Sequence, residues 1–117
     1  MTGRGERLSR PHPWVVFAWD RRAALGWRNL LSQALDSLDR AWVAITADPR
    51  GVSGRQRRLE GSLGLVKIHG ADREQWQYEV TSGGRIWYAI DDDRRTLWIT
   101  HAGTGHPKQT DTRGGRP

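Results

Sequence analysis

The sequence predicts an α+β domain in which two helices pack on one face of an antiparallel sheet. Three observations predict it. The first part of the chain has apolar residues at helical spacing, the second part alternates bulky and polar residues, and turns rich in glycine or aspartate separate the alternating segments. A run of helices followed by a run of strands is typical of α+β folds. A length of 117 residues fits one domain.

A short strand and a two-helix hairpin are expected first. The apolar run 13–19 is rich in β-branched and aromatic residues, and Asp20 can cap the helix after it. One straight helix from there to Ala47 would be about 40 Å long, so we expect two helices that fold back near 31–34. Pro49 ends the second helix. The expected core stripe is Trp27, Leu31, Ala34 or Leu35, Leu38, Trp42 and Ile45.

The rest of the domain is expected to be a β-meander. Residues 50–58 form a basic loop, and "LEGSLGLVKI" begins the strands. The strands "QWQYEVT", "RIWYAI" and "TLWITH" follow, joined by the turns "SGG" and "DDDRR". The acidic turn is expected to be solvated. We expect a flexible basic arm at 1–12, a single domain at 13–108 and a flexible tail at 109–117.

Composition limits the possible functions. The net charge is +6 with a pI near 11.0. The excess of basic residues is densest between residues 50 and 73, a segment with six basic residues and two acidic ones. Such a surface attracts nucleic acid or the ribosome, although it also serves solubility. Cysteine is absent, which excludes disulfides and cysteine chemistry. With no secretory signal and no apolar run of about 18 residues, we expect a soluble cytoplasmic protein without membrane contact.

The strand "RIWYAI" suggests a phosphate-handling face. Arg85 and Trp87 point to one side of this strand, and Ile86, Tyr88 and Ile90 to the other. If the helices cover the second side, Arg85 faces solvent and can bind phosphate oxygens, with Trp87 beside it to stack on a base. The alternative pairs Arg85 with Glu79 across the hairpin and makes Trp87 part of the core.

Two histidines follow the last strand. His101 and His106 bracket "AGTG", and Lys108 comes just after them. Histidine titrates near neutral pH and can shuttle protons. No third ligand stands at a telling spacing, so we expect no metal, and no cofactor motif is present. Arg, Lys, His and Glu suffice to cleave RNA, because the 2′-hydroxyl supplies the nucleophile.

The order of these segments resembles toxins of the RelE/ParE superfamily from bacterial type II toxin–antitoxin systems. The segments are "ADPR", "LEGSL", "GRIWY", "DDDRR" and "LWITHAGTGHPK", and the resemblance covers about residues 14–108. It implies an α+β fold, a neutralising antitoxin and, in the RelE-like branch, metal-independent cleavage of mRNA in the ribosomal A site. The antitoxin is expected to cover the basic open face or to displace a terminal element.

The resemblance also assigns roles to residues. Arg85 would stabilise the scissile phosphate, His106 would be the general acid with His101 as its competitor, and Glu60 is a candidate base. RNA and ribosome binding is expected from Arg57, Arg58, Lys67, Trp87 and Lys108.

Two other functions stay open. A ParE-like protein inhibits DNA gyrase without catalysis. A non-catalytic RNA- or ribosome-binding module would use Trp87 and Trp98 as stacking platforms.

Overall fold

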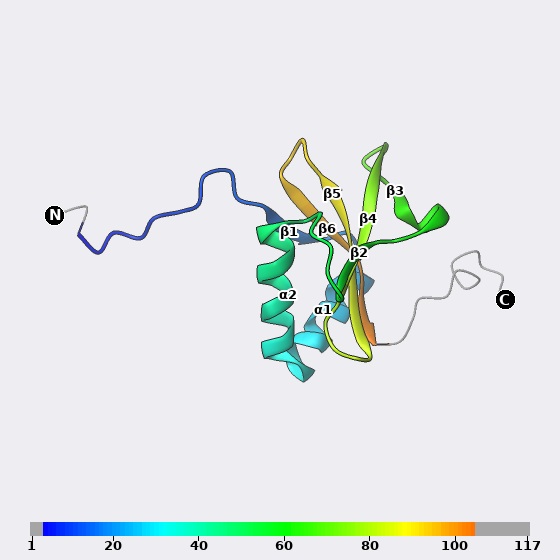
Figure 1. Ribbon diagram of the computed structural model, residues 1–117, viewed down its shortest axis with the longest axis horizontal. Coiled ribbons are helices and arrows are strands. Elements are labelled where there is room, and N and C mark those ends of the chain that lie inside the picture. The colour runs from blue at the N-terminus through cyan, green and yellow to red at the C-terminus, as the bar shows by residue number, and fades with distance from the viewer. Residues whose placement is uncertain (1–3, 105–117) are drawn as a thin grey trace.

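The computed structural model describes residues 4–104 and shows two helices beside a six-stranded sheet (Figure 1). The elements in chain order are β1 (Val15–Ala18), α1 (Arg21–Gln33), α2 (Leu35–Ala47), β2 (Gln56–Arg58), the short 3-10 helix η1 (Gly61–Gly64), β3 (Leu65–Ile68), β4 (Ala71–Glu79), β5 (Gly84–Asp91) and β6 (Thr96–Thr104). The predicted α+β class is confirmed.

The predicted helical hairpin is also confirmed. Asp20 caps α1, since its Oδ1 accepts a hydrogen bond of 2.8 Å from the backbone N–H of Ala23. Ala34 has a non-helical backbone (φ −147°, ψ 56°) and separates α1 from α2. The second helix ends at Ala47, two residues before Pro49. None of the helices in the described range 4–104 is long and apolar enough to span a membrane.

The strand order of the sheet is β1-β6-β5-β4-β2, and β3 pairs with the first part of β4. Among the strands of residues 4–104, β1 and β6 pair in parallel and the other pairs are antiparallel. The prediction of a loop over 50–58 is wrong at its end, because Gln56–Arg58 form β2 opposite Trp76–Tyr78. The segment after it does not begin as a strand, because Gly61 takes a left-handed φ of +63° and η1 precedes β3.

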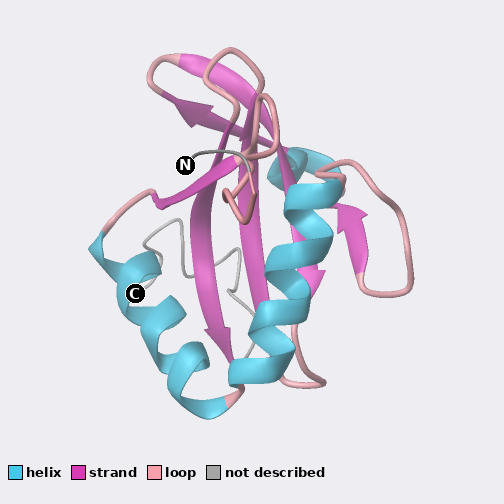
Figure 2. Cartoon of the chain, turned by 90° about the vertical axis from the view of Figure 1, so that its left-hand side faces the viewer, coloured by secondary structure: helices cyan, strands magenta, loops and turns pink. Residues whose placement is uncertain are grey.

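The helices cover one face of the sheet, as expected. Ile86, Tyr88 and Ile90 are at most 1% exposed and pack with buried residues of α1 and α2. Figure 2 shows both helices on the same side of the sheet. Helix α1 approaches β6 so closely that a Cβ atom on Gly26 would lie 1.9 Å from the carbonyl oxygen of Ala102. A glycine is therefore required at this crossing.

The predicted core stripe is only partly right. Leu38 and Ile45 are buried, but Leu31, Leu35 and Trp42 are 44%, 59% and 41% exposed. The break at Ala34 turns the second helix relative to the first, so each helix buries a narrow stripe of its own. Those stripes are Ala23 and Leu30 in α1, and Leu38, Ala41 and Ile45 in α2.

The acidic turn at the end of β5 is not solvated throughout. Asp91 is fully buried, and its carboxylate accepts hydrogen bonds from Arg94 Nη1 (3.1 Å) and Trp98 Nε1 (3.3 Å), with Arg73 Nη2 at 3.3 Å. Burial alone would raise the pKa of Asp91, but these hydrogen bonds and the charge of Arg73 lower it overall. The expectation of a solvated turn is therefore wrong for Asp91.

Candidate active site on the helix-free face of the sheet

The face of the sheet turned away from α1 and α2 carries a row of side chains from four strands. Arg57 of β2 lies opposite Gln77 of β4, Gln77 lies opposite Trp87 of β5, and Trp87 lies opposite His101 of β6. Residues directly opposite in an antiparallel ladder point to the same face, so the four side chains form one line across the sheet. We call them the polar row. Arg57 at its edge is exposed.

A β-bulge places His101 in the polar row. Tyr88 pairs with Ile99 whereas Trp87 pairs with His101, so Thr100 is an extra residue on β6. Without the bulge, the alternation of β6 would turn His101 toward the helices. Bulges commonly re-aim a side chain in this way. The extra residue is held by a hydrogen bond of 2.5 Å from Thr100 Oγ1 to Gln75 Oε1.

The environment of His101 favours the neutral imidazole. Burial lowers the pKa of His101 below its ordinary 6.5, and the positive charge of Arg85 lowers it further. Its ring meets Trp87 edge to face at 5.6 Å between centroids. Within the described part of the chain, Nε2 of His101 is buried and has no hydrogen-bond partner. A neutral histidine of this kind can accept a proton.

Arg85 and Trp87 lie on the helix-free face, but they are not exposed. Arg85 is 6% and Trp87 8% accessible, so the expectation that Arg85 faces solvent is wrong. Glu79 stands opposite Arg85 in the ladder, as the alternative required, and Trp87 is buried as that alternative expected. Trp87 Nε1 donates a hydrogen bond of 2.9 Å to Gln77 Oε1. A phosphate can reach Arg85 only if neighbouring groups move aside.

The structure does not bring the other predicted residues into this row. Arg58 donates from Nε and Nη2 to the carbonyl oxygen of Gly64 and so anchors η1. Lys67 Nζ pairs with Asp72 Oδ1 at 2.9 Å in the β3–β4 hairpin. Glu60 is exposed between β2 and η1. His106 and Lys108 lie outside the described residues.

Sequence reasoning missed Gln75 and Gln77. Both are buried on the helix-free face, where Gln75 Nε2 also donates to the carbonyl oxygen of Leu63 at 2.8 Å. Their alternation with Trp76 and Tyr78 was the available signal, since it predicts a polar second face for β4. The described residues contain no cluster of three or more His, Cys, Asp or Glu side chains that could hold a metal ion.

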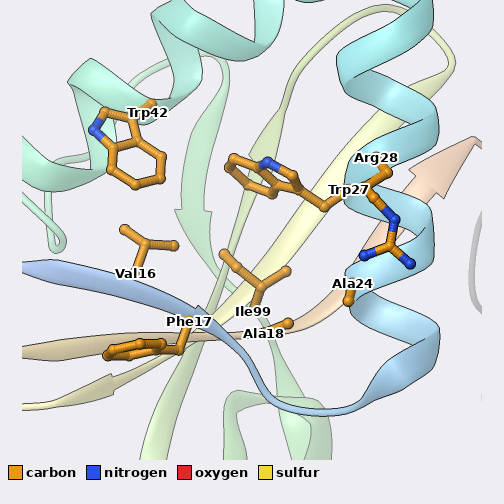
Figure 3. Close-up of a pocket in the computed structure, with 8 residues that line it drawn as sticks. All are labelled: Val16, Phe17, Ala18, Ala24, Trp27, Arg28, Trp42 and Ile99. Atoms are coloured by element: carbon orange, nitrogen blue, oxygen red, sulfur yellow. The ribbon is translucent and has the colours of Figure 1, made fainter.

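A cavity lies between the helices and β1 (Figure 3). This cavity of about 170 Å³ is apolar apart from Arg28, and Trp27 and Trp42 face each other across it at 5.9 Å between ring centroids. It adjoins a hollow of about 270 Å³ to which the exposed Leu31 and Leu35 contribute. We call the two hollows together the helix groove. Its charged lining residues are Arg28 and Asp39, and its remaining, apolar lining can receive apolar side chains.

Comparison with known proteins relates this chain to others by fold. No family model matches the sequence, and no curated protein matches it. The isolated RelE toxin of E. coli has a TM-score of 0.52 at 20% identity, covering 86% of this chain and 93% of RelE. A metal-bound toxin from Helicobacter pylori has a TM-score of 0.54 at 14% identity, covering 78% of this chain and 93% of that one.

A mutant E. coli RelE in complex with a peptide of the antitoxin RelB has a TM-score of 0.52 at 19% identity, covering 88% of this chain and 95% of RelE. These likenesses establish that this chain has a RelE-like fold.

Proposed function

We propose that this protein is the toxin of a type II toxin–antitoxin system and cleaves mRNA on the ribosome without a metal ion. The observation that carries the proposal is that Arg85, His101 and Arg57 lie on one sheet face, with the pKa of His101 lowered by burial and by Arg85. The RelE-like fold supports the same function.

The proposed reaction needs only groups of the protein and the RNA. Neutral His101 takes the proton from a 2′-hydroxyl, and the 2′-oxygen attacks the adjacent phosphorus. The bond from phosphorus to the 5′-oxygen then breaks, leaving a 2′,3′-cyclic phosphate and a 5′-hydroxyl. Arg85 stabilises the charge that develops on the phosphate oxygens. A general acid protonates the leaving oxygen, for which His106 remains the predicted residue.

An antitoxin partner is part of the proposal. One structural neighbour is a RelE mutant bound to a peptide of its antitoxin RelB. In this chain the helix groove offers exposed apolar side chains, Leu31, Leu35 and Trp42, that a partner would cover. The alternative binding site for the antitoxin is the basic helix-free face, which the sequence led us to expect it to cover.

One observation favours a second candidate function. Arg85 is 6% exposed, and a buried guanidinium suits a structural role better than phosphate binding. A ParE-like inhibitor of DNA gyrase, with no catalysis, would need no accessible arginine on this face. The first candidate cuts RNA, whereas the second inhibits gyrase and cuts no RNA.

The deciding experiment is primer extension on an mRNA incubated with purified protein, with and without ribosomes. We expect discrete cuts at A-site codons only when ribosomes are present. Arg85→Ala should slow cleavage by about 10²–10³-fold, as for loss of one preorganised donor. Arg22→Ala, which removes an exposed arginine of α1, should cut at the wild-type rate. Circular dichroism and thermal unfolding of both variants separate lost chemistry from lost structure.

Intact mRNA with folded wild-type protein would overturn the proposal, and a gyrase supercoiling assay would then test the second candidate. If Arg85→Ala unfolds the protein, Arg85→Lys keeps the positive charge but removes the guanidinium fork, and its rate gives the answer.

The pH profile of cleavage tests the role of His101. Because the base must be neutral, the wild-type rate should fall as the pH drops through the lowered pKa of His101. His101→Gln should reduce the rate by about 10²-fold or more and remove this acid limb. An acid limb that persists in His101→Gln would assign the base to another residue.

A further inference from the structure

We propose that four aromatic side chains on the helix-free face form a stacking platform for an unpaired base of the bound RNA. These residues, the ring cluster, are Phe17, Trp19, His69 and Trp98. The inference rests on the proposed RNA-cleaving function and adds a second contact to the same substrate.

The ring cluster is built from three separate parts of the chain. Trp98 of β6 is its centre and meets Phe17 of β1 at 5.7 Å, Trp19 at 5.5 Å and His69 at 5.3 Å between ring centroids. Trp19 and His69 also meet each other edge to face at 5.2 Å. The pairs among Trp19, His69 and Trp98 are edge to face, whereas Phe17 is tilted by 32° against Trp98, and such contacts hold the rings in preferred orientations.

Phe17 and Trp19, at the outside of the ring cluster, are more exposed than rings that serve only to stabilise the fold. Phe17 is 54% and Trp19 36% accessible, while Trp98 is half-buried. The central ring is held in place, because Trp98 Nε1 donates a hydrogen bond of 3.3 Å to the buried carboxylate of Asp91. The cluster is therefore a preformed surface, which keeps the entropic cost of binding low.

His69 reaches the cluster through a strained turn. His69 and Gly70 connect β3 to β4 with φ values of +49° and +81°, the left-handed pair of a tight hairpin turn. Asparagine, aspartate or glycine normally occupies the first of these positions, since other residues are strained there. A histidine at this position directs its ring onto Trp19 and Trp98.

The ring cluster lies on the same face as the polar row. Trp98 pairs with Ala89, which is two residues after Trp87 on β5, and Phe17 pairs with Trp98 in the parallel ladder. Figure 3 shows Val16 and Phe17 on opposite sides of β1, with Val16 toward the helices. Trp98 and His101 are three residues apart on β6, which is about 10 Å along a strand. One RNA strand can span both sites.

The make-up of the cluster favours a nucleobase over a protein segment. All four of its members present flat rings, whereas the exposed apolar residues Leu31 and Leu35 of the helix groove are aliphatic. Every base has a π-face, so rings of this kind hold unstacked nucleotides whatever their sequence, at about 1–3 kcal/mol per base. The platform would position the strand while the polar row acts on the neighbouring phosphate.

The test measures binding of a labelled single-stranded 2′-O-methyl RNA of about six nucleotides. Because this probe lacks the nucleophilic hydroxyl, affinity is measured without cleavage. We expect Phe17→Leu and Trp19→Leu to weaken binding about tenfold each, since leucine keeps the apolar bulk but not the ring. Trp19→Phe and Phe17→Tyr should restore most of the affinity. The same RNA with one abasic position over the platform should bind equally to wild type and to both leucine variants.

The outcomes separate the two proposals. If the folded wild type binds no RNA, the platform is overturned, whereas the RNA-cleaving function, which requires the ribosome, is decided separately by primer extension. If the wild type binds and the leucine variants bind as well as it does, the platform alone is overturned, and a protein-docking role would give this result. If the leucine substitutions weaken binding of the abasic RNA as much as binding of the intact RNA, the rings act only through the fold, and the platform is also overturned.

Discussion

On one side of β5, Ile86, Tyr88 and Ile90 pack beneath α1 and α2; on the other, Arg85 and Trp87 lie among the polar side chains of neighbouring strands. All five residues are buried. The helix-covered face contains a single polar group among these residues, the hydroxyl of Tyr88. That hydroxyl donates to the carbonyl oxygen of Pro49 at 2.8 Å and accepts from Gln56 Nε2 at 3.0 Å.

The helix-free face is buried in a different way. Its buried members are glutamines, an arginine and a tryptophan, and Gln75, Gln77 and Trp87 make specific hydrogen bonds in place of close apolar packing. Burying such groups is costly unless they are paired, so this face contributes less to stability than its burial suggests. Burial of the helix-covered face of β5 thus stabilises the fold, whereas burial on the helix-free face changes the charge and the pKa of the titratable side chains there.

The largest effect on the helix-covered face is expected from Gly26→Ala. The added Cβ would lie 1.9 Å from the backbone oxygen of Ala102, so α1 must move away from β6. We expect the free energy of unfolding to fall by about 3 kcal/mol. Urea denaturation measures it, and Gly83→Ala is the control, because a Cβ there would meet nothing within 4 Å. Equal stability of the two variants would mean that α1 does not pack this closely.

A smaller effect is expected from Tyr88→Phe, which tests the boundary between the faces. The variant removes one buried hydroxyl and leaves the carbonyl oxygen of Pro49 without that donor. The free energy of unfolding should fall by about 1–2 kcal/mol, with RNA cleavage unchanged. A cleavage defect without loss of stability would show that the helix-covered face takes part in function. Burial raises the pKa of Tyr88, so the phenol should stay protonated up to strongly alkaline pH, which ultraviolet titration checks.

The smallest effect is expected at the strand ends, where Arg50 bridges Glu74 and Asp92 at 3.1 and 2.8 Å. Hydrogen bonds from Arg50 hold the pKa of Glu74 below 4.5 and that of Asp92 below 3.8. Because these folded pKa values lie below the unfolded ones, the stabilisation is present above about pH 4.5 and is lost as the pH falls through the folded values.

Arg50→Met should therefore cost less than about 1 kcal/mol near neutral pH, since the pair is exposed and screened by solvent. The difference from wild type should vanish toward about pH 2. Urea denaturation over this pH range measures it. A difference that persists at low pH would indicate that the stem of Arg50, and not its charge, stabilises the strand ends.

Much of the fold could be predicted because local patterns decide it. The cap at Asp20, the break before Leu35 and the inward face of β5 follow from residue type and spacing. The exposure of Trp42 could not be predicted, because periodicity gives the face of a helix but not the orientation of one helix relative to the other. The burial of the tryptophans could not be predicted from their number either: of the seven, only Trp76 and Trp87 are buried.

The site was harder to predict, for a physical reason. The position of His101 depends on a bulge, and a single extra residue reverses the face of every later side chain in a strand. No local sequence signal marks that bulge. The burial of Arg85 likewise depends on contacts between strands that are distant in sequence. The ring cluster joins Phe17, His69 and Trp98, which only the tertiary structure brings together.

The parallel pairing of β1 with β6 has a consequence for synthesis. Val15 pairs with Thr96, and Gly26 of α1 rests against Ala102, so the first strand and helix of the described residues find their partners in β6, the last strand described. Contacts so distant in sequence form late and slow folding. Until β6 has been synthesised, the apolar side of α1 is exposed to solvent and β1 has no partner strand. The fold can therefore be completed only after β6 has left the ribosome.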